Sequence, residues 1–368
     1  MKLLVFAHTP PPHHGQSYMV QLLLEGLGAR KRIQLFHVNS RLSDDLEDIG
    51  RVRFTKIALV LKYGLQAIGL RFRHGVRCIY YIPASPSRGA LYRDWLTMAL
   101  CRPFFSKLVF HWEAAGLAEW LMSQGTATER FLSRWLLGRP ELSVVLADYN
   151  RQDPEYFRSK RTVVVPNGVP DPFSGISPPK TTDRQPDIFK VLFLGLCTRE
   201  KGIWDAIEGV ALANRKNAIR FRLLVAGGFW THDEKRAFEK RVAELRFADG
   251  SPQVEYRGFV SGKAKRALFE ESDCLLFPTY YSAESFGIVL VEAMAHSLPV
   301  ITTRWRMIPE LLPKGYPLVV SPKSPPEIAE ALHRVRAQAS AWNLRQHYLD
   351  NFTDRHYLDK MEAALLSL

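Results

Sequence analysis

Long apolar runs and clustered cysteines are scarce in this 368-residue sequence. Its four cysteines, at positions 78, 101, 197 and 274, form no CxxC pair, which excludes a disulfide framework and favours a reducing, cytoplasmic compartment. No segment reaches the roughly 18 apolar residues of a membrane span, because Lys62 interrupts the longest one, 57–70. The apolar run 3–7 is too short for a signal-peptide core. We therefore expect a cytoplasmic protein without a spanning helix.

Acidic residues are scarce between positions 51 and 107, where eleven Lys or Arg accompany a single acid, Asp94. The net charge is +13, with +10 on residues 1–170 (23 − 13) and +3 on residues 171–368 (27 − 24). Such an excess favours an anionic partner. The interleaved basic and apolar residues of 51–77 fit a helix on an anionic membrane surface, or a packing helix with a solvated basic rim. Nucleic acid is not expected as a partner, because no RRM, KH or helix-turn-helix signature is present.

The length predicts two domains. Short apolar runs alternate with longer amphipathic segments, a pattern typical of βα units and parallel sheets. The pattern predicts an α/β domain over 1–170, a Pro-rich linker over 171–186, a second α/β domain over 187–345 and a helical C-terminal segment over 346–368. Strands are expected at 3–7, 33–38, 78–82, 107–112, 142–146, 162–165, 191–194, 221–226, 254–257, 274–277 and 299–302.

Two glutamates are separated by seven residues, Glu284 and Glu292. Glu284 lies where the loop after strand 274–277 meets an apolar helix that we expect to begin near Phe286. The free N–H groups of a first helical turn form an anion site. Glu292 would lie about 9 Å further along the axis, where a carboxylate suits vicinal hydroxyls such as those of a ribose. Taken singly, each glutamate is also explained as a residue that favours a helix N-terminus or a solvated helix surface.

Lys201 and His111 each follow or end an expected strand. Lys201 comes a few residues after strand 191–194, and a lysine is a mobile point charge suited to phosphate oxygens. His111 lies near the end of strand 107–112, and ligands bind at the carboxyl ends of strands in open α/β sheets. Each also has a plain structural interpretation, as a surface lysine before a helix and as a packed histidine.

Five segments follow one another along the chain: Pro11–Gly15, Pro166-Asn167-Gly168, Phe193-Leu194-Gly195 with Glu200-Lys201-Gly202, Glu284-x7-Glu292 with Phe286-Gly287, and Ile308-Pro309-Glu310. In their composition and order they resemble glycosyltransferase family 4, the retaining family with the GT-B fold, in its bacterial surface-polysaccharide type. The resemblance implies two Rossmann-like parallel-sheet domains facing a central cleft, with the acceptor domain first and the nucleotide-sugar domain second. It also implies that the terminal helix packs back on the N-terminal domain.

The same resemblance implies roles for individual residues. Lys201 would hold the donor diphosphate, Glu284 the donor sugar and Glu292 the ribose, with His111 beside the reacting centre. The family's arginine after Gly195 is Leu196 here, so Arg199 is a candidate replacement. Further donor-binding positions, several through their backbone, are Gly15, Val260, Phe286, Gly287, Ile288 and Val289. Trp112 and Glu113 are candidates to touch donor or acceptor.

The implied activity is a hexosyltransferase that moves a sugar from a UDP- or GDP-type donor to a glycan or lipid-linked glycan acceptor in cell-surface polysaccharide biosynthesis. No cofactor and no metal are expected, because no DxD pair follows a strand and Asp44-Asp45 lies in a polar stretch. The implied location is the cytoplasm or the inner face of the cytoplasmic membrane. A nucleotide-sugar 2-epimerase, which needs no acceptor, is the alternative on the same fold.

Overall fold

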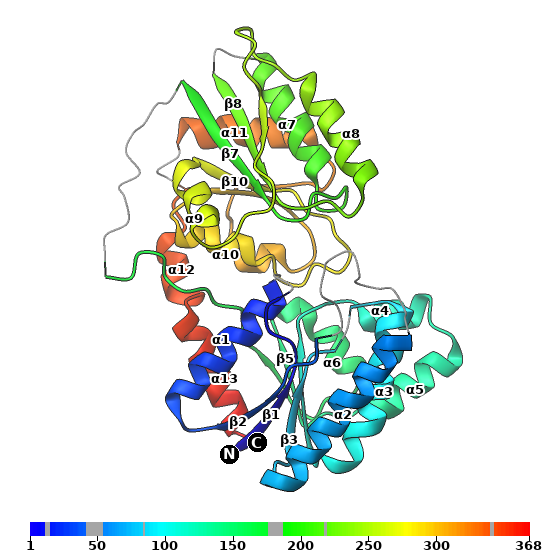
Figure 1. The fold of residues 1–368 in the computed structure, drawn as a ribbon. Coiled ribbons are helices and arrows are strands. Elements are labelled where there is room, and N and C mark those ends of the chain that lie inside the picture. Colours follow the sequence, from blue (N-terminus) through cyan, green and yellow to red (C-terminus); the bar gives the residue numbers. More distant parts are fainter. Residues whose placement is uncertain (12–14, 42–53, 84, 176–186, 217–218, 339–341) are drawn as a thin grey trace. The chain divides into compact units, whose positions relative to one another are not determined.

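The chain forms two compact units, each built on one parallel sheet (Figure 1). The computed structural model describes residues 1–11, 15–41, 54–83, 85–175, 187–216, 219–338 and 342–368. Unit 1 comprises Met1–Asn167 with Asp354–Leu368, and unit 2 comprises Gly168–Thr353. The predicted α/β class with a parallel sheet in each half is confirmed. Loop residues 12–14, Asp44-Asp45 and residues 176–186 of the expected linker lie outside the described residues.

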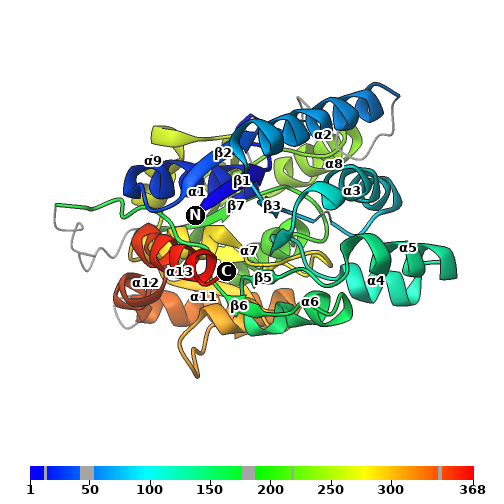
Figure 2. The same cartoon turned by 90° about the horizontal axis from the view of Figure 1, so that it is seen from below.

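Unit 1 has a six-stranded sheet in the order β2-β1-β3-β4-β5-β6, with every neighbouring pair parallel. Helices α1 and α13 lie on one side of the sheet, and α2, α3 and α5 lie on the other (Figures 1 and 2). The strands are β1 (Lys2–Phe6), β2 (Gln34–Val38), β3 (Cys78–Tyr81), β4 (Lys107–Trp112), β5 (Leu142–Val145) and β6 (Thr162–Val164). The helices are α1 (Gly15–Arg30), α2 (Phe54–His74), α3 (Arg88–Cys101), α4 (Leu117–Ser123), α5 (Ala127–Leu137), α6 (Gln152–Tyr156) and α13 (Asp354–Leu366), with short 3₁₀ turns η2 (Arg102–Phe104) and η3 (Asp148–Arg151).

The strands of unit 1 are buried on both faces, as expected for a sheet covered by helices on either side. On β4, Phe110 and Trp112 enter the core shared with α3 and α5, whereas His111 points to the opposite face because side chains alternate along a strand. Within the described ranges, no helix is long and apolar enough to cross a membrane.

Unit 2 has a second six-stranded parallel sheet, in the order β12-β11-β10-β7-β8-β9. Helices α7 and α11 pack against each other, as do α10 and α12. The strands are β7 (Ile188–Leu194), β8 (Arg220–Ala226), β9 (Val254–Tyr256), β10 (Cys274–Phe277), β11 (Val300–Thr303) and β12 (Val319–Val320). The helices are α7 (Ile203–Lys216), α8 (His232–Ala243), α9 (Gly262–Glu271), α10 (Ile288–Ala295), α11 (Pro325–Ala337) and α12 (Arg345–Asn351), with the 3₁₀ turn η4 (Ile308–Leu311).

The strand order of unit 2 changes direction between β7 and β10. From β7 the chain adds β8 and β9 on one side, then returns to add β10, β11 and β12 on the other. The chain therefore leaves the carboxyl ends of the neighbouring strands β7 and β10 toward opposite ends of the strand order. In open α/β sheets this is where ligands bind, so the topology marks the edge at which to look for a site.

Three segments differ from the sequence predictions. Strand β12 was not predicted, because two residues are too few for an alternation to be detected. Helix α10 begins at Ile288 rather than near Phe286, because Gly287 adopts a left-handed conformation (φ 70°) that ends the preceding loop.

The expected helical segment 346–368 is divided into α12 in unit 2 and α13 in unit 1. The division falls at Phe352 and Thr353. There the Phe352 carbonyl accepts from Val169 N–H at 3.0 Å, and Thr353 forms a parallel bridge with Val169. These contacts replace helical hydrogen bonds, so the helix stops before α13 begins.

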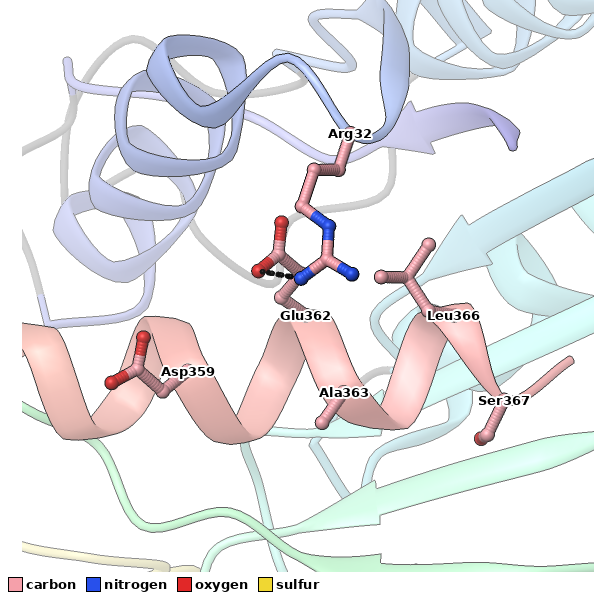
Figure 3. Close-up of a pocket in the computed structure, with 6 residues that line it drawn as sticks. All are labelled: Arg32, Asp359, Glu362, Ala363, Leu366 and Ser367. Atoms are coloured by element: carbon pink, nitrogen blue, oxygen red, sulfur yellow. Dashed lines mark hydrogen bonds and ion pairs between the residues drawn. The ribbon is translucent and has the colours of Figure 1, made fainter.

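Helix α13 packs on α1, and a shallow surface pocket lies beside this contact (Figure 3). Arg30 pairs with Asp359 at 2.8 Å, and Arg32 pairs with Glu362 at 3.3 Å. Because its charged groups are paired with one another, this pocket is explained by helix packing. None of the predicted site residues lines it; the lining residues are Arg32, Asp359, Glu362, Ala363, Leu366 and Ser367.

Candidate functional site

The turn after β7 carries Lys201 and is pressed against the end of β10. Gly202 has φ 82°, and a Cβ there would lie 2.2 Å from the Pro278 carbonyl oxygen, so only glycine fits. The Tyr280 N–H also donates to the Glu200 carbonyl at 2.8 Å. These two contacts fix Lys201 beside the loop that follows β10.

Lys201 and Glu284, 83 positions apart in the sequence, form an ion pair in unit 2. Lys201 Nζ lies 2.7 Å from Glu284 Oε2, and the Thr279 hydroxyl donates to the same oxygen at 3.0 Å. Glu284 is buried, whereas Lys201 is partly exposed. The ammonium group also lies 4.8 Å from the centre of the Tyr281 ring, an arrangement that favours a cation. Burial raises the pKa of the Tyr281 hydroxyl above its ordinary value.

Helix α10 begins at Ile288, four residues after Glu284. A Cβ on Gly287 would lie 3.1 Å from the Phe277 ring and 3.2 Å from Ile308, so the left-handed turn is tightly enclosed. The Phe286 side chain is buried and packs edge-on against Phe352, with 6.2 Å between the ring centres. Its backbone, rather than its ring, is therefore what this position can offer a ligand. The first-turn N–H groups, including those of Ile288 and Val289, give α10 the positive end that attracts anions.

Glu292, the fifth residue of α10, has a different basic partner from Glu284. Its Oε1 lies 2.6 Å from Nζ of Lys265 on α9. Its Oε2 is buried and has no hydrogen-bond partner among the described residues. The two glutamates of the motif are thus each neutralised by a lysine from a separate element.

The other positions predicted in unit 2 lie on the loops after β7 and β9. Arg199 is exposed and lies near Asp205, whose pKa is raised by burial and lowered in part by Arg199. Val260 is half-buried and follows Gly258, whose carbonyl accepts from Gly227 N–H at 2.9 Å. Both loops leave the same sheet edge as Lys201.

His111, on β4 of unit 1, is fully buried, and Tyr80 of β3 is its neighbour on the same face of the sheet. The Tyr80 hydroxyl hydrogen-bonds to Nδ1 of His111, and Glu113 Oε1 lies 3.5 Å from that nitrogen. Burial lowers the pKa of His111 to about 3, so its imidazole is neutral at physiological pH. Its Nε2 has no hydrogen-bond partner in the described part of the chain.

Glu113 is also buried, and its pKa is raised to about 7 by that burial. Asn167, from the Pro-Asn-Gly turn, donates to Glu113 Oε2 at 3.2 Å. Burial raises the pKa of the Tyr357 hydroxyl on α13, and the nearby Glu113 carboxylate raises it further. Trp112, by contrast, stacks on Phe157 in the core and donates to Ser143 at 3.1 Å. The structure therefore corrects the expectation that Trp112 touches a ligand, since the indole is a core residue.

The structure thus brings Lys201 and Glu284 into contact and places Glu292 on the same helix motif, while His111 and Gly15 belong to unit 1. Sequence reasoning missed Thr279 and Lys265, because neither forms a pattern with the residue that it contacts. It also missed Tyr80, whose pairing with His111 depends on strand register. Over the described ranges, no three His, Cys, Asp or Glu side chains are grouped to hold a metal ion.

Residues 179–351 match the model of the family Glycosyl transferases group 1. The C-terminal half is similar to these enzymes. An uncharacterized glycosyltransferase of Methanocaldococcus jannaschii is 31% identical over 169 residues, 45% of this chain and 40% of that protein. A glycosyltransferase of Escherichia coli, provisionally named for colanic acid biosynthesis, is 28% identical over 128 residues, 33% of this chain and 30% of that protein. The matches thus span 40% or less of these relatives.

Solved structures resemble the whole chain. Sucrose-phosphate synthase from Thermosynechococcus elongatus has a TM-score of 0.73 at 18% identity, covering 100% of this chain and 99% of the other. HepE of Anabaena, solved in complex with UDP, has a TM-score of 0.69 at 17% identity with both chains covered completely; the same protein was solved with UDP-glucose. At such low identity the likeness establishes the fold. The predicted GT-B fold, with two Rossmann-like domains, is confirmed.

Proposed function

We propose that this protein is a retaining glycosyltransferase that uses a nucleoside-diphosphate sugar of the UDP or GDP type. The observation that carries the proposal is the Lys201–Glu284 ion pair of 2.7 Å, formed between the loops that follow the neighbouring strands β7 and β10. A lysine that is partly exposed and held by one carboxylate can exchange that partner for a diphosphate. The similarity of residues 179–351 to group 1 glycosyltransferases supports this interpretation of the pair.

In the proposed reaction the bond between the donor sugar C1 and the diphosphate oxygen breaks. A bond forms between C1 and an acceptor hydroxyl oxygen on the same face, and the hydroxyl proton passes to the leaving diphosphate. Lys201, with Arg199 and the backbone of Gly287, Ile288 and Val289, would stabilise the charge that accumulates on the diphosphate. Preorganised electrostatics of this kind is commonly the largest catalytic contribution.

Glu284 would accept hydrogen bonds from the donor sugar hydroxyls, and Glu292 from the ribose. The base would lie near Val260, against the loops after β8 and β9. The neutral imidazole of His111 suits a hydrogen-bonding role beside the sugar better than a proton-transfer role, because its pKa of about 3 keeps it unprotonated. We propose a metal-independent hexosyl transfer, for which Lys201 supplies the positive charge.

The proposed acceptor is a glycan or lipid-linked glycan of cell-surface polysaccharide biosynthesis. A relative provisionally named for colanic acid biosynthesis supports that assignment. The nucleotide-sugar 2-epimerase alternative is not favoured, because the family model and the relatives described above are glycosyltransferases.

A thermal-shift panel tests the donor site with UDP, GDP, ADP, TDP and their glucose conjugates, each with magnesium and with EDTA. A nucleotide at one hundred times its dissociation constant adds about 2.7 kcal/mol of stability. We expect one nucleotide class to stabilise the protein equally in both buffers, and Glu292→Ala to reduce that stabilisation by about half, because a tenfold loss of affinity costs about 1.4 kcal/mol. The absence of a shift with every nucleotide would overturn the proposal. The anomeric configuration of the transferred sugar, read by NMR, tests retention.

We further propose that unit 1 attaches to the inner face of the cytoplasmic membrane through the helical layer α2, α3 and α5. Four large apolar side chains there are each about two-thirds exposed: Leu65 and Phe72 on α2, and Phe131 and Trp135 on α5. Asp94, the single acid between 51 and 107, is buried and accepts from Tyr81 at 2.7 Å. The described part of α2 therefore combines exposed apolar groups with the exposed cations Lys62 and Arg73, a combination that suits anionic lipid.

Sedimentation with vesicles tests this surface. We expect wild type to bind phosphatidylcholine vesicles that contain phosphatidylglycerol, and to be released by salt. The double variant Phe131→Ser/Trp135→Ser should bind about tenfold more weakly, whereas Trp230→Ser, an exposed tryptophan of unit 2, should bind like wild type. Equal binding by all three proteins would contradict the assignment.

A further inference from the structure

Lys265 is the partner that the structure gives to Glu292, and nothing in the sequence motif anticipates it. The two side chains come from adjacent helices, α9 and α10, with Nζ and Oε1 2.6 Å apart. Both are partly exposed, with 30% of the lysine side chain and 21% of the glutamate side chain accessible. This pair therefore lies at a surface that a ligand can reach.

Helices α9 and α10 are also linked through His296, the residue that follows α10. Its N–H and Nδ1 both hydrogen-bond to the Glu292 carbonyl, at 3.1 and 2.8 Å. Its ring stacks on Phe269 of α9, with 4.7 Å between ring centres and 14° between planes. Glu292 is thus fixed to α9 through its backbone and through its carboxylate.

The Glu292 carboxylate retains unused acceptor capacity. An ionised carboxylate accepts several hydrogen bonds through two oxygens, yet Oε1 has the one lysine contact and Oε2 has no partner among the residues that the structure describes. A buried acceptor without a donor costs free energy. Two vicinal hydroxyls would supply the donors.

We propose that Lys265 is a positioning residue that holds the Glu292 carboxylate for the ribose hydroxyls of the donor, and so makes the site select ribonucleotides over 2′-deoxyribonucleotides. This inference rests on the proposed function. Lys265 does two things in it. It restrains the carboxylate in one orientation, and it offsets the repulsion that a second carboxylate would exert on the incoming diphosphate.

Calorimetric titration of the full chain with UDP, dUDP, GDP and dGDP tests the inference. Wild type should bind the ribonucleotide of its preferred base about tenfold more tightly than the deoxy form, the value of one hydrogen bond to a charged group. Glu292→Gln should reduce that preference to about twofold. Lys265→Met should do the same, and Lys265→Arg, which keeps the cation, should restore most of it.

Lys263→Met provides the matched control, because Lys263 is an exposed lysine on the same helix. It should keep the full ribose preference. Adding Lys265→Met to Glu292→Gln should change the preference no further, because the lysine acts through the glutamate. Thermal unfolding without nucleotide identifies a variant that fails to fold, and the arginine variant then carries the test.

Two failures are distinguishable. If wild type binds none of the four nucleotides, the proposed function fails, and the inference fails with it. If wild type prefers the ribonucleotide and Lys265→Met keeps the preference undiminished, the donor site stands and the role of Lys265 is overturned. A merely structural role for Lys265 would lower the unfolding temperature and weaken both sugar forms equally.

Discussion

The two units treat buried charge in opposite ways. In unit 2, each glutamate of the motif is matched by a lysine, Glu284 by Lys201 and Glu292 by Lys265. In unit 1, burial disfavours the charged forms of the candidate groups, lowering the pKa of His111 to about 3 and raising that of Glu113 to about 7. The comparison indicates that unit 2 is suited to exchange ion-pair partners with an anion. Unit 1 is suited to offer the neutral imidazole of His111 as a hydrogen-bonding group.

The largest expected effect comes from removing one member of an ion pair in unit 2. Lys201→Met should lower kcat about 1,000-fold, or about 4 kcal/mol, because the leaving diphosphate loses its positive partner. Initial rates with a nucleotide sugar measure the loss, and Lys263→Met is the control. A loss smaller than tenfold would show that Lys201 is not the diphosphate ligand.

Gly202→Ala should destabilise unit 2 by about 3 kcal/mol, because the new Cβ would clash with the Pro278 carbonyl and the backbone conformation is left-handed. Gly250 has the same φ of 82°, but a Cβ there meets nothing within 4 Å. Gly250→Ala should therefore cost only the conformational strain, about 1 kcal/mol. Urea unfolding of both variants separates clash from strain, and equal losses would refute the close approach of the two loops.

Glu113→Gln should reveal the raised pKa of Glu113 through the pH dependence of the free energy of unfolding. The folded pKa of about 7 exceeds the ordinary 4.5, so the unfolded chain releases this proton first as pH rises. Wild type therefore loses stability between about pH 4.5 and 7, by about 3 kcal/mol. Between pH 4.5 and 8, the free energy of unfolding of the glutamine variant should rise by that amount relative to wild type. The contribution of His111 cancels in this difference because both proteins contain it.

Urea unfolding at a series of pH values measures this gain. Glu119→Gln, an exposed glutamate on α4, should show a flat difference from wild type. A flat difference for Glu113→Gln as well would mean that Glu113 is ionised in the folded chain.

The smallest expected effects come from two matched capping boxes, one in each unit. Thr126 caps α5 with Glu129, and Thr231 caps α8 with Glu234. Thr126→Ala and Thr231→Ala should each cost about 1 kcal/mol. If calorimetry resolves two unfolding transitions, each variant should shift the transition of its own unit. A shift of both transitions by either variant would show that the units unfold together.

Much of the fold could be predicted from the sequence, because parallel strands buried on both faces are nearly continuous apolar runs. Strands such as β4 and β10 lie where those runs predicted them. The two-residue β12 and the break between α12 and α13 could not be predicted, since both depend on partners distant in the chain, as with Val169 and Thr353.

For the candidate site, the sequence by itself determined which residue types are present at which spacing: a lysine between glycines after one strand, and two glutamates around the start of a helix. Only the tertiary structure decided their partners. Lys201 meets Glu284 because β7 and β10 are neighbours in the sheet, and Lys265 meets Glu292 because α9 lies beside α10. Spacing along a chain fixes the position of a side chain on its own element, whereas an ion pair between elements depends on how those elements pack.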